Sequence, residues 1–120
     1  MTFYGLTDSF LVDKSTRNLL ENQFSDCLSF ISTKVIDDDK YGDGDFYIMY
    51  FNNLISGLNR EKSIINFRLD DIFVVESTAE LPLIFKFNNC NTLTFADETF
   101  KKFVEENNIE GWIFREAFEI

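Results

Sequence analysis

The sequence predicts an α+β fold with a mainly antiparallel sheet of about six to eight strands and two helices, each preceding a strand. Short runs of alternating apolar and polar residues indicate the strands, and two apolar stripes of helical period behind an Asp indicate the helices. The turns between the runs are too short for parallel crossovers. At 120 residues, with 15 Phe, the chain is expected to form a single domain, residues 1–120, around a Phe-rich core.

The N-terminal third predicts an apolar segment, a helix and a strand. Residues 1–12 are apolar and irregular, which is typical of a short strand or a packed arm. Asp13 or Ser15 then caps a helix that ends near Gln23. Cys27–Ile36 follows as the next strand.

The middle of the sequence predicts several strands joined by turns. The apolar run Phe46–Phe51 is typical of a strand buried on both faces near the centre of a sheet. Residues 52–62 indicate a loop. Two short strands are expected at Ser63–Arg68 and Ile72–Glu76, and a further strand through Phe85 turns back at residues 88–91.

The C-terminal stretch has the clearest pattern of all: strand, helix, turn and strand. Asp97 is placed to cap the helix, and Gly111 suits a turn with a positive φ. The last strand is expected to bury a single face. That face carries Trp112, Phe114, Phe118 and Ile120.

The C-terminal unit has a faint counterpart near the start of the chain. Shifting Leu11–Ile36 by 84 positions superimposes it on Phe95–Ile120 without a gap, although only four of the 26 paired residues are identical. Asp13 then meets Asp97. This interpretation predicts two helix–strand units that flank a central sheet.

Composition narrows the classes of function. The net charge of −10 and the pI of about 4.3 disfavour nucleic acid and anionic membranes as ligands, and favour rapid capture of a basic partner. The N-terminus lacks a basic signal-peptide region, and no apolar run approaches the length of a membrane span. We therefore expect a cytoplasmic protein in which Cys27 and Cys90 are free thiols.

The chain contains no His, which removes Ser-His-Asp and Cys-His nucleophilic sites and the HExxH zinc site. It also lacks the glycine-rich phosphate-binding and dinucleotide-binding motifs, so no cofactor is expected. A pair of carboxylates could still hydrolyse a sugar. Because there are 21 acidic residues, the sequence singles out no such pair, and we expect a protein that is not an enzyme.

An acidic segment, DDDKYGDGD, separates two predicted strands. It differs from a calcium-binding EF-hand loop because Tyr41 and Ile48 stand where oxygen ligands are needed, and no helices flank it. A looser carboxylate site, a solvated hairpin tip and a docking surface for cationic side chains remain open. The predicted partner-binding residues are Asp37, Asp38, Asp39, Asp43 and Asp45.

Three stretches resemble the immunity proteins of bacterial polymorphic toxin systems, in particular the group called immunity protein eleven. They are FLVDKSTRNLLENQFSDCLSFISTKVI, DFYIMYFNNLISGLNREKSII and LPLIFKFNNCNTLTFADETFKKFVEENNIEGWIF, which together cover most of residues 10–120. Ala96 stands where the family usually has a Ser ahead of its second helix.

The resemblance implies a protein that binds and neutralises a toxin made by the same cell, and the charge implies a basic toxin. Three alternatives remain: a generic acidic interaction domain without a toxin partner, a carboxylate-based or metal-assisted hydrolase, and a calcium-binding module.

Overall fold

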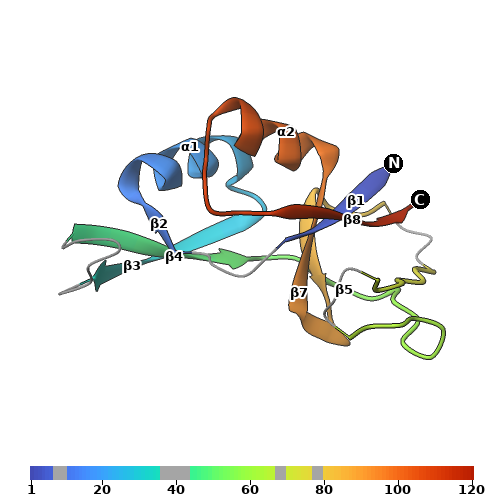
Figure 1. The fold of residues 1–120 in the computed structure, drawn as a ribbon. Coiled ribbons are helices and arrows are strands. Elements are labelled where there is room, and N and C mark those ends of the chain that lie inside the picture. The colour runs from blue at the N-terminus through green and yellow to red at the C-terminus, as the bar shows by residue number, and fades with distance from the viewer. Residues whose placement is uncertain (7–10, 36–43, 67–69, 77–79) are drawn as a thin grey trace. The chain divides into compact units, whose positions relative to one another are not determined.

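The computed structural model describes residues 1–6, 11–35, 44–66, 70–76 and 80–120, and it confirms the predicted α+β class (Figure 1). Within these residues there are eight strands and two helices, and each helix precedes a strand. The strands are β1 (Thr2–Leu6), β2 (Leu11–Asp13), β3 (Leu28–Val35), β4 (Gly44–Phe51), β5 (Leu54–Ile55), β6 (Ile84–Phe87), β7 (Cys90–Asp97) and β8 (Phe114–Glu119). The helices are α1 (Lys14–Phe24) and α2 (Glu98–Glu106).

The strands lie in two sheets and not in the one sheet that the sequence predicts. One sheet has five strands in the order β5-β6-β7-β1-β8, and the other has three in the order β2-β4-β3. Pairing is antiparallel apart from β5 with β6, so the prediction of mainly antiparallel pairing is confirmed. The chain separates into two compact units: unit 1 is Met1–Asp8 with Asn53–Ile120, and unit 2 is Ser9–Asn52.

Unit 2 is a three-stranded sheet with α1 on one face (Figure 1). β4 is the central strand, as predicted, but burial of both its faces is wrong. Met49 points toward α1 and is buried, whereas its neighbours Ile48 and Tyr50 are exposed on the opposite face. The reason is that a single helix covers a single face. Among the described side chains of unit 2, the buried ones are Val12, Leu20, Phe24, Leu28 and Met49.

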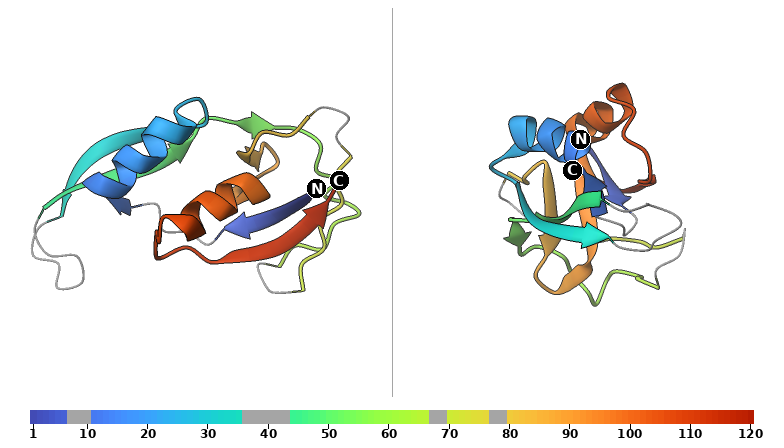
Figure 2. Two further views of the ribbon diagram at one scale, coloured as in Figure 1. Left: turned by 90° about the horizontal axis from the view of Figure 1, so that it is seen from above. Right: turned by 90° about the vertical axis from the view of Figure 1, so that its left-hand side faces the viewer.

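Unit 1 buries both faces of the middle of its sheet. Side chains alternate along β1, so Tyr4 lies against α2 while Phe3 joins an apolar cluster on the other face. In Figure 2 (left), α2 runs alongside β1 and β8. Aromatic rings fill the cluster, as the prediction of a Phe-rich core requires. Its buried members are Phe3, Leu58, Phe85, Phe87, Cys90, Phe95 and Phe118.

Both predicted helix starts are confirmed. The Asp13 carboxylate accepts a hydrogen bond from the Thr16 amide at 2.8 Å, and the Asp97 carboxylate accepts one from the Phe100 amide at 3.0 Å. α2 ends before Asn108, which has a φ of 54°, while the predicted turn at Gly111 has a φ of 100°. No helix in the described part of the chain is long and apolar enough to cross a bilayer.

The two short strands predicted at Ser63–Arg68 and Ile72–Glu76 are wrong where the structure describes them; Phe67 and Arg68 lie outside the described residues. Isolated bridges of Ile64 with Ile72 and of Leu58 with Val75 are present instead. Side chains occupy backbone groups that a strand ladder would use: Ser63 Oγ accepts from the Val74 amide at 2.9 Å, and the Asp71 carboxylate accepts from the Asn66 amide at 3.0 Å.

The single buried face predicted for the last strand is also wrong. Phe114 pairs with Leu6 on the α2 face, whereas Phe118 pairs with Phe3 and stacks on it at 5.0 Å in the opposite cluster. The register shifts between these pairs, leaving Ala117 as an extra residue. Such a β-bulge reverses the side on which the following residues point.

Units 1 and 2 repeat one arrangement. In unit 1, β7, α2 and β8 follow in sequence and β1 lies between the two strands. In unit 2, β2, α1 and β3 follow in sequence and β4 lies between the two strands. The paired segments are those that the 84-residue shift superimposes. The predicted helix–strand units are therefore present, but each belongs to its own sheet and they do not flank a common one.

Candidate functional site

Asp45 is the predicted partner-binding residue that the structure describes. It is exposed on β4, where its Cα pairs with that of Lys34 on β3. The other predicted residues, Asp37, Asp38, Asp39 and Asp43, lie outside the described residues, so their grouping with Asp45 stays a prediction. The calcium interpretation of this segment stays untested for the same reason.

The face of the β2-β4-β3 sheet opposite α1 exposes apolar side chains, and we call it the open face. It is formed by alternate residues of the three strands: Leu11, Asp13, Ser29, Ile31, Thr33, Phe46, Ile48 and Tyr50. Ile31, Ile48 and Tyr50 are 55 %, 37 % and 46 % exposed. Ile48 pairs with Ile31 on one side and with Leu11 on the other, so these residues are contiguous. Contiguous exposed apolar residues on a sheet are typical of a surface that binds a protein.

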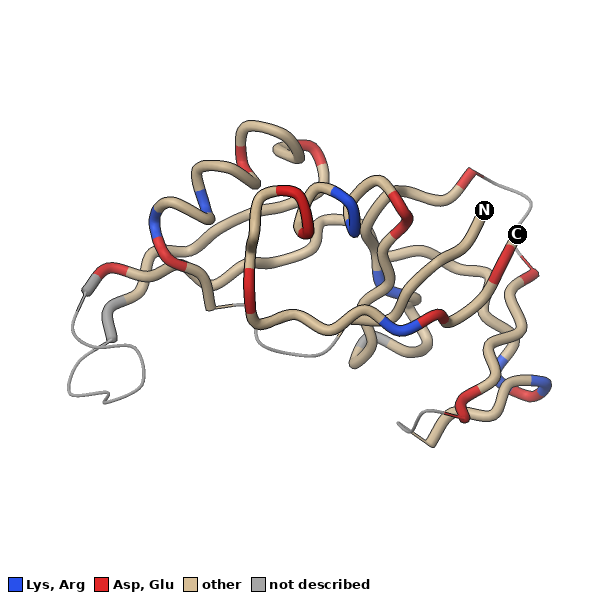
Figure 3. Tube along the Cα trace, turned by 45° about the horizontal axis from the view of Figure 1, so that its top comes forward, with Lys and Arg blue, Asp and Glu red and all other residues tan. Residues whose placement is uncertain are grey.

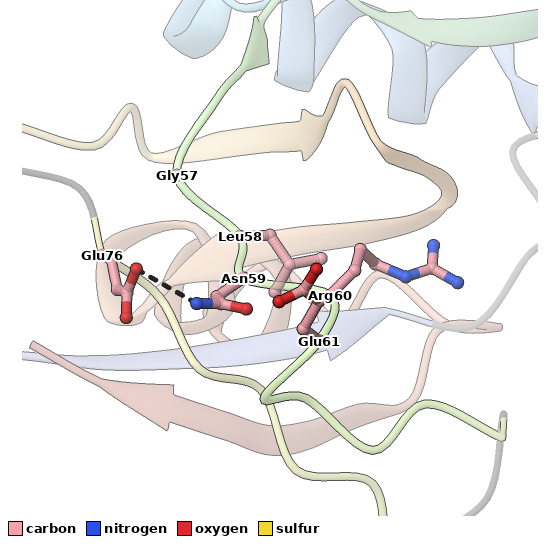
Figure 4. A pocket seen from close by; sticks show the side chains of 6 residues that line it. All are labelled: Gly57, Leu58, Asn59, Arg60, Glu61 and Glu76. Atoms are coloured by element: carbon pink, nitrogen blue, oxygen red, sulfur yellow. Dashed lines mark hydrogen bonds between the residues drawn. The ribbon is translucent and has the colours of Figure 1, made fainter.

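A polar pocket of about 420 Å³ lies in the irregular part of unit 1 (Figure 4). The Glu76 carboxylate accepts hydrogen bonds from Asn59 Nδ2 at 3.2 Å and from Lys62 Nζ at 3.4 Å. The Arg60 guanidinium donates to the Asn89 carbonyl at 2.7 Å. Four of the six residues that line the pocket are polar or charged. The lining residues are Gly57, Leu58, Asn59, Arg60, Glu61 and Glu76.

A charged cluster covers Tyr4 on the α2 side of unit 1. The Tyr4 hydroxyl donates to the Glu98 carboxylate at 2.9 Å, and this bond, followed by burial, raises the pKa of Tyr4. Lys101 Nζ lies 5.1 Å above the Tyr4 ring and 2.7 Å from the Glu105 carboxylate. The bond to Glu105 raises the pKa of Lys101. Both residues are therefore held in their neutral-pH forms, a phenol and an ammonium ion.

The two capping carboxylates have opposite pKa shifts. Hydrogen bonds from Thr16 lower the pKa of Asp13, which is exposed. Burial raises the pKa of Asp97 despite its bond to the Phe100 amide. These shifts accompany a structural role at the two helix starts.

Metal ligands do not gather in the described part of the chain: no three His, Cys, Asp or Glu side chains there are placed to hold a metal ion. Cys27 and Cys90, in units 2 and 1, are both free thiols. The described surface thus offers contact through apolar, polar and acidic side chains.

Sequence reasoning missed the open face. The signal was present in part, because Phe46–Phe51 is apolar at every position and the sequence predicts one helix, before Gln23, in the first 51 residues. It also missed the ring contacts of the two helices. Arg17 lies 4.9 Å from the Tyr47 ring in unit 2 just as Lys101 lies over Tyr4 in unit 1, and the 84-residue shift superimposes Arg17 on Lys101.

Searches for relatives found nothing similar: no protein-family profile, no curated protein and no solved structure matches this chain.

Proposed function

We propose that this chain is an immunity protein, which binds a cognate bacterial toxin directly and neutralises it without catalysing a reaction. The observation that carries the proposal is the excess of acidic over basic residues, 21 against 11. A strongly acidic protein attracts basic proteins over distances of about 10 Å at moderate ionic strength, and it can cover the surface with which a basic nuclease holds its substrate. The resemblance to the immunity protein eleven group supports the same conclusion.

The acidic segment between β3 and β4 is the first candidate for contact with the toxin. Asp45, at its end, is exposed on β4. The sequence adds four carboxylates within the preceding eight residues, so the segment is a candidate contact for clustered Lys and Arg of a partner. We expect these residues to accelerate association more than they slow dissociation, because charges at the rim of an interface act mainly on the encounter of the two proteins.

A rescue assay tests the function itself. The protein encoded immediately upstream is expressed in a bacterial host with and without this chain, and surviving cells are counted. We expect the upstream protein to kill alone and this chain to restore growth. If the upstream protein is harmless, or kills in both cases, the immunity proposal fails and an acidic interaction domain with another partner takes its place.

A charge-neutralising variant tests the contact surface. Changing Asp37, Asp38, Asp39, Asp43 and Asp45 to Asn should slow association and flatten its dependence on salt, with the melting temperature unchanged. A control variant removes five negative charges at exposed positions outside this segment, by changing Asp to Asn and Glu to Gln. The residues changed are Asp26, Asp70, Glu80, Glu106 and Glu110. Equal association rates for the two variants would remove the segment from the interface, while rescue could still succeed.

A further inference from the structure

The edges of the two sheets differ in how they are protected from pairing with another chain. An unpaired edge strand exposes backbone donors and acceptors, and proteins block such edges by making them short or by placing charges on them. β5 has two residues and β2 has three. β8 carries the exposed charges Arg115, Glu116 and Glu119, visible as blue and red segments before the C-terminus in Figure 3. These three edges are protected.

β3 is the exception among the described edges. It has eight residues, LSFISTKV, and lies at the edge of the three-stranded sheet with β4 as its neighbour. From Leu28 to Thr33 it contains no charged residue. Ile31, in the middle of this stretch, is 55 % exposed. β3 has one charged residue, Lys34, which lies near its end. An edge strand with a neutral stretch of this length and an exposed β-branched residue is a template for strand pairing.

The repeat shows which residues β3 lacks. β3 and β8 are equivalent strands of units 2 and 1, and the 84-residue shift places Ile31 on Arg115 and Ser32 on Glu116. Arg115 and Glu116 are both exposed on β8. Unit 2 therefore has an apolar and a neutral residue at the two positions where unit 1 has charges that oppose pairing.

We propose that β3 pairs with β3 of a second copy of this chain, in antiparallel orientation about a two-fold axis at Ile31. The axis is perpendicular to the sheet, so residues pair with partners on the same face and the two sheets join into one. Ile31 meets Ile31 of the second copy and Ser29 meets Thr33. Apolar and hydroxyl pairs of this kind stabilise antiparallel sheets.

The proposed register favours a second copy as the occupant. A basic partner gains little from an edge without carboxylates, whereas two copies of β3 place no like charges opposite each other from Leu28 to Thr33. In the proposed register the two copies of Lys34 lie at opposite ends of the paired strands. The remaining cost is the mutual repulsion of two chains with a net charge of −10 each, and salt screens it.

Sedimentation equilibrium across a dilution series tests the proposal. We expect a concentration-dependent dimer that strengthens as salt is raised, which is the opposite of the salt dependence expected for a basic partner. Ile31→Arg combined with Ser32→Glu gives β3 the residues of β8 and should weaken the dimer by tenfold or more. Ile113→Arg is the matched control, because Ile113 is 56 % exposed and lies outside the strands.

A cross-linking experiment tests the register. In a Cys27→Ser background, Ile31→Cys should form an intermolecular disulfide under mild oxidation, because directly opposed residues of paired strands lie close enough for one. Thr33→Cys should form little, because its two copies would be about 13 Å apart along the strands. Circular dichroism confirms that each variant is folded before it is compared.

Three outcomes would overturn the proposal: a monomer at every concentration and salt level, a dimer that resists the Ile31→Arg, Ser32→Glu change, or equal cross-linking at the two cysteine positions. If β3 pairs with a different protein and not with a second copy, this chain stays monomeric at every concentration, and the proposal is overturned. The dimer is independent of the immunity function, so rescue can succeed or fail in either case.

Discussion

Unit 1 and unit 2 contain the same split β-α-β arrangement, but they differ in what covers the second face of the sheet. In both, a strand leads into a helix, the helix leads into a second strand, and a third strand lies antiparallel between the two. The third strand comes before the arrangement in unit 1, as β1, and after it in unit 2, as β4. The order of the elements along the chain thus differs between the two units, whereas the order of the three strands in the sheet is the same.

The correspondence extends to individual contacts. In each unit the helix-capping Asp pairs across the sheet with a Phe: Asp97 with Phe3 in unit 1, and Asp13 with Phe46 in unit 2. Each of these Phe residues is followed by a Tyr whose ring lies below a cation from the helix. The same local arrangement of strand, capping Asp and helix therefore packs against both sheets.

The cation on each helix has a second shared contact. Arg17 pairs with Glu21 at 2.9 Å, and Lys101 pairs with Glu105 at 2.7 Å, in both cases four residues along the helix. Leu20 and Val104, which the 84-residue shift superimposes, are both buried.

The difference lies on the face away from the helix. In unit 1, Phe3 and Phe95 are buried there among residues from the segment between β5 and β6, including Leu58 and Phe73. Unit 2 has no described counterpart of that segment, and its equivalent face is the open face. The two units thus share the side that faces the helix. On the opposite side unit 1 has an apolar core, whereas unit 2 has exposed apolar residues.

Paired Phe substitutions give the largest expected effect and can break this comparison. Phe3→Ala should lower the free energy of unfolding by about 3–5 kcal/mol, because it empties part of a closed aromatic cluster. Phe46→Ala, at the equivalent position on the open face, should cost about 1–2 kcal/mol, because Phe46 is half-buried and water can fill the space.

Denaturant unfolding measures both losses. Circular dichroism follows the whole chain, while fluorescence of the single Trp, Trp112, follows unit 1, where its ring stacks on Phe100 at 5.9 Å. Equal losses for Phe3→Ala and Phe46→Ala would mean that the open face is covered in solution, and the contrast between the units would disappear.

Local signals predicted the parts that repeat. Asp13 and Asp97 are good caps followed by apolar stripes, and both helices begin where the sequence indicates. These starts depend on contacts within one helical turn, which neighbouring residues in the sequence determine. The central position of Phe46–Phe51 followed in the same way from its apolar run.

Non-local contacts decided what the sequence could not predict. The bulge at Ala117 sends Phe118 to a different face from Phe114, and no residue type marks it. The division into two sheets depends on which strands pair, and the exposure of Ile48 and Tyr50 depends on the absence of a second layer in the described part of unit 2. For the candidate site, the sequence indicated acidic character but not the apolar face.

Replacing the two capping Asp residues by Asn tests whether the caps of the two units have different environments. The expected change in stability is smaller than that of the Phe substitutions. Asn caps helices about as well as Asp, so the substitution mainly removes the charge. Bonds from Thr16 lower the pKa of Asp13 in the folded protein, so its charge stabilises the fold at neutral pH and the contribution is lost as the pH falls through that pKa. Burial raises the pKa of Asp97, so its charge is unfavourable at neutral pH, and this cost is relieved as the pH falls through its raised pKa.

Thermal unfolding from neutral to acidic pH measures the difference. At neutral pH we expect Asp13→Asn to lower the melting temperature and Asp97→Asn to leave it unchanged or raise it, with both differences from the parent shrinking in acid. Asp13→Ala, which removes the cap itself, should cost about 1 kcal/mol at neutral pH and provides the reference. Identical pH profiles for the two Asn variants would contradict the assigned environments.

The two helix cations give the smallest expected effect and test whether the repeat is energetic as well as geometric. Arg17→Met and Lys101→Met keep an unbranched apolar stem but remove the charged end, so each loses a cation–π contact and an ion pair. For these partly exposed sites the two losses together should amount to about 0.5–1 kcal/mol. Arg17→Lys should retain most of the stability, because Lys occupies the equivalent position in unit 1.

Urea unfolding at low and high salt separates the two contributions. Salt screens the pairs with Glu21 and Glu105, so the loss in each variant should decrease but not vanish, the remainder coming from the ring contact. Lys102→Met is the matched control: Lys102 is exposed on the same helix and neighbours Lys101. If Lys102→Met costs as much as Lys101→Met, the stability depends on the net charge of the helix and not on the position of Lys101 over the Tyr4 ring. The two units would then share the geometry of this contact, but the contact itself would not stabilise them.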